Sequence, residues 1–145
     1  MDAAQDEKPS GDDMLENIPL FRGLEKEELK AIADSSKEMV FRAGETIVKE
    51  GDAGLGFYLI TEGKALVKHN GKTLAKLGRG SFFGEMSLLD DQPRSADVLA
   101  EEPTKCRVLL RWNFWSAVSK NQKIPRAMLQ EMARRLRATN NALSE

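Results

Sequence analysis

The sequence predicts a mainly β fold with flanking helices: an antiparallel jelly-roll β-barrel between N-terminal helices and a C-terminal helix. Three observations support this prediction. Apolar residues recur with a period of two over residues 38–111. Nine of the eleven glycines lie between Gly44 and Gly84, where a barrel of short strands needs its turns. The Asn-Gly pair at 70–71 is typical of a two-residue hairpin turn.

Length, charge and composition limit the class of protein. The 145 residues are enough for one domain, and 22 basic against 23 acidic residues argue against a surface built throughout for nucleic acid. A single cysteine, Cys106, excludes an intramolecular disulfide and a thiolate zinc cage. A single histidine, His69, argues against a catalytic metal site built from several histidines.

The sequence also bears on location. No apolar run approaches the roughly 20 residues that span a bilayer, and the N-terminus lacks the features of a secretory signal. We therefore expect a cytoplasmic protein without a membrane partner.

The N-terminal part is expected to contain a tail and two helices. Residues 1–13 are acidic and offer nothing to bury, which predicts a disordered tail. The domain is expected over residues 14–143, with helices in residues 14–37. The first helix would carry Met14, Leu15 and Ile18 behind a cap at Asp12 or Asp13, and the second would cover Glu25–Ala33.

The barrel is expected over residues 38–111. Its predicted strands lie around Met39–Phe41 and Ile47, and at Phe57–Thr61, Ala65–His69, Thr73–Leu77, Ala96–Ala100 and Cys106–Leu110. Glycines at 44, 51, 54, 56, 63, 71 and 78 are interpreted as corner residues between these strands.

Residues 112–143 return to the helical period. One short helix is predicted over Trp112–Ser119 and a longer one from Ile124 to about Leu143. The longer helix carries a seam of residues spaced by three and four: Leu129, Met132, Leu136, Thr139 and Leu143. This seam suits either a homodimer or packing on the chain's own barrel. The helix is also basic, but it lacks interleaved aromatic residues, so nucleic acid is not the expected partner.

The segment over residues 82–98 interrupts the strand pattern. Glu85–Leu89 has the composition of one or two helical turns, and a helix that begins at Gly84 would offer free N–H groups to an anion. Arg94 would add a permanent charge suited to phosphate, and Ser95 a hydroxyl donor. Glu85 fits there if the ligand also carries a hydroxyl group, as a sugar phosphate does. The alternative is that Glu85 and Arg94 are solvent-facing charges.

The string Phe83-Gly-Glu-Met-Ser-Leu-Leu followed by Pro93-Arg-Ser-Ala resembles the phosphate-binding cassette of cyclic nucleotide-binding domains. Ile18–Leu24, the Ala43-Gly-Glu-Thr-Ile string and Phe57–Gly63 resemble other parts of that family. Residues 131–139 are similar to the dimer helix of bacterial catabolite activators, in which this helix closes over the purine.

The resemblance implies a role for each matching residue. Glu85 would accept a hydrogen bond from the ribose 2′-hydroxyl, Arg94 would pair with the cyclic phosphate, and Ser95 would donate to it. The remaining implied ligand contacts are backbone N–H groups of Gly84, Met86 and Ser87, and base contacts from Thr139 and Asn140. No metal or other cofactor is implied.

Two positions depart from the family's pattern. Many members carry alanine where Ser87 stands, so its hydroxyl would either point to the phosphate or cap the short helix. Asp97 replaces the usual small, hydroxyl or aromatic residue; it would either face solvent or disturb purine recognition.

The expected function is therefore a regulatory module that binds a cyclic nucleotide, most of all cAMP, and signals through its C-terminal helices to an unidentified protein effector. The alternatives are a sensor of cGMP or another nucleotide, and an interaction domain that binds no nucleotide. An enzyme is not expected, because the metal ligands that a cupin or a phosphodiesterase needs are missing.

Overall fold

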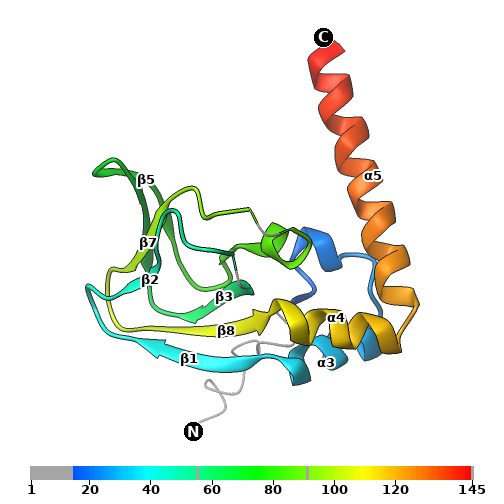
Figure 1. Cartoon of the computed structure of the whole chain (residues 1–145), viewed down its shortest axis with the longest axis horizontal. Coiled ribbons are helices and arrows are strands. Elements are labelled where there is room, and N and C mark those ends of the chain that lie inside the picture. Colours follow the sequence, from blue (N-terminus) through cyan, green and yellow to red (C-terminus); the bar gives the residue numbers. More distant parts are fainter. Residues whose placement is uncertain (1–14, 55, 91, 145) are drawn as a thin grey trace, which may run out of the picture.

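The computed structural model describes residues 15–54, 56–90 and 92–144. Two four-stranded antiparallel sheets form the β part, and the helices gather at one end of it (Figure 1). This arrangement confirms the mainly β fold with flanking helices that the sequence predicts. The predicted acidic tail, residues 1–13, and the caps at Asp12 and Asp13 lie outside the described residues.

The strands lie close to where the period of two places them. The first sheet has the order β1 (Lys37–Phe41), β8 (Thr104–Leu110), β3 (Gly56–Glu62) and β6 (Phe82–Phe83). The second has the order β2 (Thr46–Val48), β7 (Asp97–Ala100), β4 (Ala65–His69) and β5 (Lys72–Leu77). Strand β6 was not predicted, because two residues are too short to show a period.

The turn between β4 and β5 confirms the hairpin prediction. His69 pairs with Lys72, so the loop has two residues, and both have positive φ: 52° at Asn70 and 78° at Gly71. Two positive φ values are what the favoured hairpin turn requires. Gly56 is the first residue of β3, and it is also needed for space, because a Cβ atom there would come 2.5 Å from the Leu109 carbonyl oxygen.

One apolar cluster lies between the two sheets. Its buried members come from both: Phe41, Ile47, Ile60, Ala65, Val98, Ala100, Cys106 and Val108. Cys106 is fully buried, and this burial raises the pKa of its thiol to about 12. The thiol is therefore protonated and unreactive at neutral pH.

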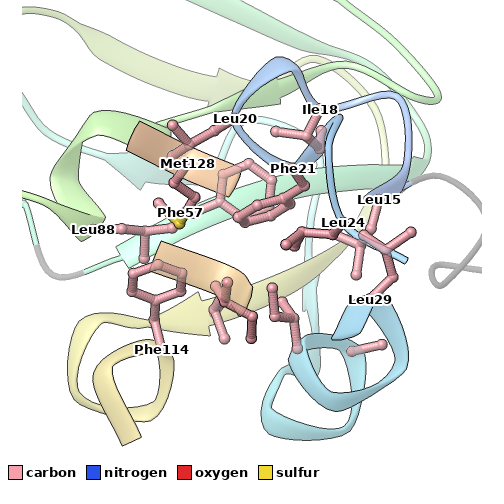
Figure 2. Close-up of a cluster of buried hydrophobic side chains, with 14 of the residues drawn as sticks. Leu15, Ile18, Leu20, Phe21, Leu24, Leu29, Phe57, Leu88, Phe114 and Met128 are labelled. Atoms are coloured by element: carbon pink, nitrogen blue, oxygen red, sulfur yellow. The ribbon is translucent and has the colours of Figure 1, made fainter. Parts of the chain in front are cut away.

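A second cluster joins the first sheet to the helices (Figure 2). These helices are the 3₁₀ helix η1 (Pro19–Phe21), α3 (Lys26–Ser35), α4 (Arg111–Lys120) and α5 (Lys123–Ser144). The Phe21 ring lies 5.9 Å from that of Phe57 and 6.4 Å from that of Phe114, measured between centroids. Leu88, the last residue of the 3₁₀ helix η2 (Glu85–Leu88), is fully buried in the same cluster. The segment that interrupts the strand pattern is thus anchored to the helical end of the molecule.

Polar contacts fix α3 at both ends. The Glu28 carboxylate accepts the Glu25 backbone N–H at 3.1 Å, which satisfies a donor at the helix start. Arg107 of β8 donates to the Ala33 carbonyl at 2.8 Å and to the Ser36 hydroxyl at 3.1 Å. Within the described residues, no helix is long and apolar enough to cross a membrane.

Candidate anion-binding site

Arg94 is a half-buried cation held by neutral acceptors. Its Nη2 donates to the Gly56 carbonyl at 2.6 Å and its Nη1 donates to the Ser87 hydroxyl at 3.0 Å. Its Cζ lies 5.9 Å from the centroid of the Tyr58 ring. Burial lowers the pKa of Arg94, and no carboxylate of the described residues contributes to that shift. The guanidinium therefore keeps its positive charge with no carboxylate among these partners, and it favours the binding of an anion beside it.

The backbone of Arg94 is fixed by a neighbouring turn. Its N–H donates to the Asp52 carbonyl and its own carbonyl accepts from Gly51, both at 2.9 Å. Gly84 lies directly against the guanidinium. Its φ is 81°, and a Cβ atom there would stand 2.3 Å from Nη1 of Arg94 and 2.8 Å from the Gly56 carbonyl oxygen. Both the conformation and the close approach therefore require glycine.

A cavity of about 300 Å³ opens beside Arg94. Its lining comes from β2, the following turn and β3: Ile47, Val48, Lys49, Asp52, Ala53, Tyr58 and Arg94. This volume is at the lower end of the range for small-molecule sites. Arg94 is expected from its local motif, but the rest of this wall is not, because short strands give no sign of which side chains face a ligand.

Ser87 and Ser95 take different positions. The Ser87 side chain is buried, with an exposed fraction of 7% for the residue, and it binds Arg94. The Ser87 N–H donates to the Gly84 carbonyl at 3.0 Å, so it closes the turn of η2, contrary to the expectation that it would face a ligand. Met86 is the second residue of η2. Ser95 is exposed and follows Arg94 at the entrance to β7.

Asp97 has a role within the fold. Its Oδ1 accepts the Glu50 backbone N–H at 2.7 Å, which ties the turn after β2 to β7. It is absent from the cavity lining. Neither of the two expectations for Asp97 describes this arrangement, because a contact over 47 positions leaves no local signal.

Glu85 connects the site to α5. Its Oε2 lies 3.5 Å from Nη2 of Arg135, and both atoms are buried without a hydrogen-bond partner. Arg135 also lies 3.5 Å from Glu131, which is buried on α5 and pairs with Arg134 as well. Arg135 was not among the expected site residues. The sequence offered one indication that Arg135 takes part in a polar contact: it follows Glu131 by four positions in a basic helix.

The expected base-contacting residues lie further along α5. Thr139 and Asn140 are exposed and do not line the cavity beside Arg94. The Thr139 hydroxyl donates to the Arg135 carbonyl at 3.0 Å. Thr139 follows Arg135 by four positions, so it lies one helical turn beyond it on the same face.

Three leucines of the predicted seam on α5 are exposed and do not pack on the β-sheets. Leu129, Leu136 and Leu143 are 67%, 61% and 80% exposed, which is high for leucine. Met132 is only partly buried against the helical cluster. Packing of the whole seam on the chain's own barrel, one of the two expected arrangements, is therefore wrong for these three leucines.

His69 lies beside one carboxylate, that of Glu50. Nδ1 of His69 lies 2.9 Å from Oε1 of Glu50, at the exposed β4–β5 hairpin. No group of three or more metal-ligating side chains occurs within the part of the chain that the structure describes.

A family model and a solved structure both match this chain. The family model for the cyclic nucleotide-binding domain matches residues 38–121. The N-terminal domain of a transcriptional regulator from Streptomyces coelicolor A3(2) superimposes with a TM-score of 0.83 at 33% identity, over 90% of this chain and 95% of that one.

Curated relatives are longer proteins. A cAMP-dependent protein kinase regulatory subunit from Emericella nidulans is 40% identical over 116 residues, which are 79% of this chain and 28% of the relative. The cyclic AMP receptor protein of Thermus thermophilus is 35% identical over 128 residues, 85% of this chain and 59% of the relative. A cGMP-dependent protein kinase from Plasmodium berghei is 38% identical over 97 residues, 67% of this chain and 11% of the kinase.

The contact between Gly84 and Arg94 can be tested by stability. We expect Gly84→Ala to lower the free energy of unfolding by about 2 kcal/mol or more. The substitution adds a Cβ atom to a residue with positive φ, and that atom would displace the Arg94 side chain. Gly80→Ala is the matched control, since Gly80 also has a positive φ, 88°, but nothing lies within 4 Å of a Cβ atom there. Urea denaturation measures both variants, and equal stability of the two would contradict the packing described.

Proposed function

The chain belongs to the cyclic nucleotide-binding domain family, and from this premise we propose that it is a regulatory module whose ligand is cAMP. The observation that carries the proposal is Arg94: a half-buried guanidinium at the edge of a cavity, whose side-chain hydrogen bonds among the described residues all go to neutral acceptors. A cyclic phosphate would supply the missing negative charge. The module would act by binding and not by catalysis, in the cytoplasm.

The other residues of the site fit the sugar phosphate. Oε2 of Glu85 is buried without a hydrogen-bond partner, and a ribose 2′-hydroxyl would provide the donor. Ser95 would donate its hydroxyl to a phosphate oxygen. Backbone N–H groups at Gly84 and Met86, where η2 begins, would add to the phosphate contacts.

The purine would lie along the cavity wall. Ile47, Val48 and Tyr58 offer apolar surface there. Thr139 and Asn140 would contact the base from α5, on the side where Arg135 reaches Glu85. The likeness of residues 131–139 to bacterial catabolite activators supports cAMP, and cGMP is the alternative.

The domain would extend beyond the residues that the family model matches, over 14–143. Leu15 and Ile18 pack in the helical cluster before residue 38, and Arg135 reaches Glu85 from beyond residue 121. Both ends thus contribute to the folded unit and to the site.

The signal would leave the site through α5. Ligand binding at Glu85 changes the environment of the carboxylate that faces Arg135, and η2 also packs through Leu88 against the cluster that contains Phe114. A ligand moves the helices only to the extent that it favours one of their arrangements. The effector would be a protein that reads this change.

The exposed stripe supports a homodimer. Leu129, Leu136 and Leu143 repeat every seven residues, which suits a two-stranded coiled coil with a second copy of the chain.

Binding is tested by calorimetric titration with cAMP and cGMP. We expect cAMP to bind more tightly, and Arg94→Ala to weaken binding about 100-fold or more, because a charge-assisted pair is lost. Arg126→Ala, an exposed arginine on α5, is the control. No binding of either nucleotide by the wild type would favour the interaction domain instead.

Transmission is tested by amide hydrogen exchange with and without cAMP. We expect cAMP to change exchange over residues 131–139, and Arg135→Ala to remove at least half of that change, because the link to Glu85 is lost. Arg137→Ala, also exposed on α5, should respond as the wild type does. An unchanged response in the Arg135 variant would rule out this route.

Dimerisation is tested by analytical ultracentrifugation. We expect the wild type to form dimers at micromolar concentrations, and Leu136→Asp to be monomeric because it places a charge in the seam. Gln130→Asp adds the same charge outside the seam and should leave the dimer intact. A monomeric wild type would refute the homodimer.

A further inference from the structure

The Ser87 hydroxyl has a partner that neither sequence expectation named. The two expectations were a hydroxyl that points to the phosphate or one that caps the short helix; instead the hydroxyl accepts a hydrogen bond from Nη1 of Arg94 at 3.0 Å. We propose that Ser87 is a positioning residue that fixes the Arg94 guanidinium toward one exocyclic oxygen of the cyclic phosphate. The inference rests on the proposed function and assigns a role to a buried side chain that the proposed function does not use.

Two anchors define the orientation of the guanidinium. Nη2 is held by the Gly56 carbonyl at 2.6 Å and Nη1 by Ser87 at 3.0 Å. One anchor belongs to β3 and the other to η2. Because the guanidinium is planar, contacts at both terminal nitrogens leave it little freedom to rotate. The group has five N–H donors, and two anchors leave three for a ligand.

Both anchors are neutral, so they leave the positive charge of Arg94 available to a ligand. A carboxylate at the position of Ser87 would orient Arg94 equally well, but it would neutralise the charge that a phosphate must meet. A hydroxyl offsets part of the cost of burying the guanidinium and leaves the charge in place. Ser87 therefore orients Arg94 without competing with an anion.

Gly54 leaves room for the Ser87 hydroxyl. A Cβ atom at Gly54 would stand 2.4 Å from Oγ of Ser87 and 2.8 Å from its Cβ. Only 7% of Ser87 is exposed, so the side chain lacks room to turn away. This close packing gives Gly54 a function that differs from the corner role expected for it: it makes space for the residue that positions Arg94.

The test uses the two phosphorothioate diastereomers of cAMP, in which sulfur replaces one or the other exocyclic oxygen. Calorimetry gives the Kd of cAMP and of both analogues for the wild type and for Ser87→Ala. We expect the variant to bind cAMP about five- to twentyfold more weakly. The ratio of the two analogue Kd values should also shift at least threefold, because Arg94 no longer favours one oxygen. A general loss of stability would not change that ratio.

Controls and contrary outcomes separate the inference from the proposed function. Ser81→Ala removes a partly buried hydroxyl that accepts the Gly78 N–H and does not line the cavity, and it should leave the ratio unchanged. If Ser87→Ala fails to fold, Ser87→Cys keeps the size with a weak acceptor and should shift the ratio in the same way. An unchanged ratio in a folded variant overturns the role of Ser87 alone. If the wild type binds no cyclic nucleotide, the proposed function fails and the inference fails with it.

Discussion

The arrangement of the site depends on burying one positive charge without neutralising it. A guanidinium taken partly out of water needs acceptors, and here they are the Gly56 carbonyl and the Ser87 hydroxyl. This requirement explains the local sequence: Gly84 lets the backbone pass against the guanidinium, and the turn at 51–52 holds the Arg94 backbone from the other side.

The site is part of the same packed unit as the helices. Leu88 belongs to the cluster that contains Phe57 and Phe114, while Glu85, three residues earlier, faces Arg135 of α5. The short 3₁₀ helix η2 thus has an apolar end in the core and an acidic end that faces Arg135 of α5. Because well-packed interiors do not deform gradually, a shift of η2 would have to be shared by α4 and α5.

The sequence allowed much of this to be predicted, and the failures have physical causes. Strands with four or more residues were found because burial imposes a period of two, whereas β6 has two residues and shows none. Arg94 and Glu85 were found because their motif is local in sequence. The pairs Asp97–Glu50 and Arg135–Glu85 join residues 47 and 50 positions apart, and only the fold brings them together. The need for space at Gly56 was not predicted, because a glycine needed for space cannot be distinguished in a sequence from one needed for a turn.

Helix α5 carries two neighbouring stripes with different partners. Glu131, Arg135 and Thr139 lie along one line of the helix, from which Arg135 reaches Glu85. Leu129, Leu136 and Leu143 lie along another, roughly 100° around the axis at 3.6 residues per turn, and are exposed. Since a single rigid element bears both stripes, a ligand that reorients the first must also reorient the second. Coupling of this kind is reciprocal: a partner that holds the leucine stripe in the ligand-favoured arrangement must also raise the affinity for the ligand.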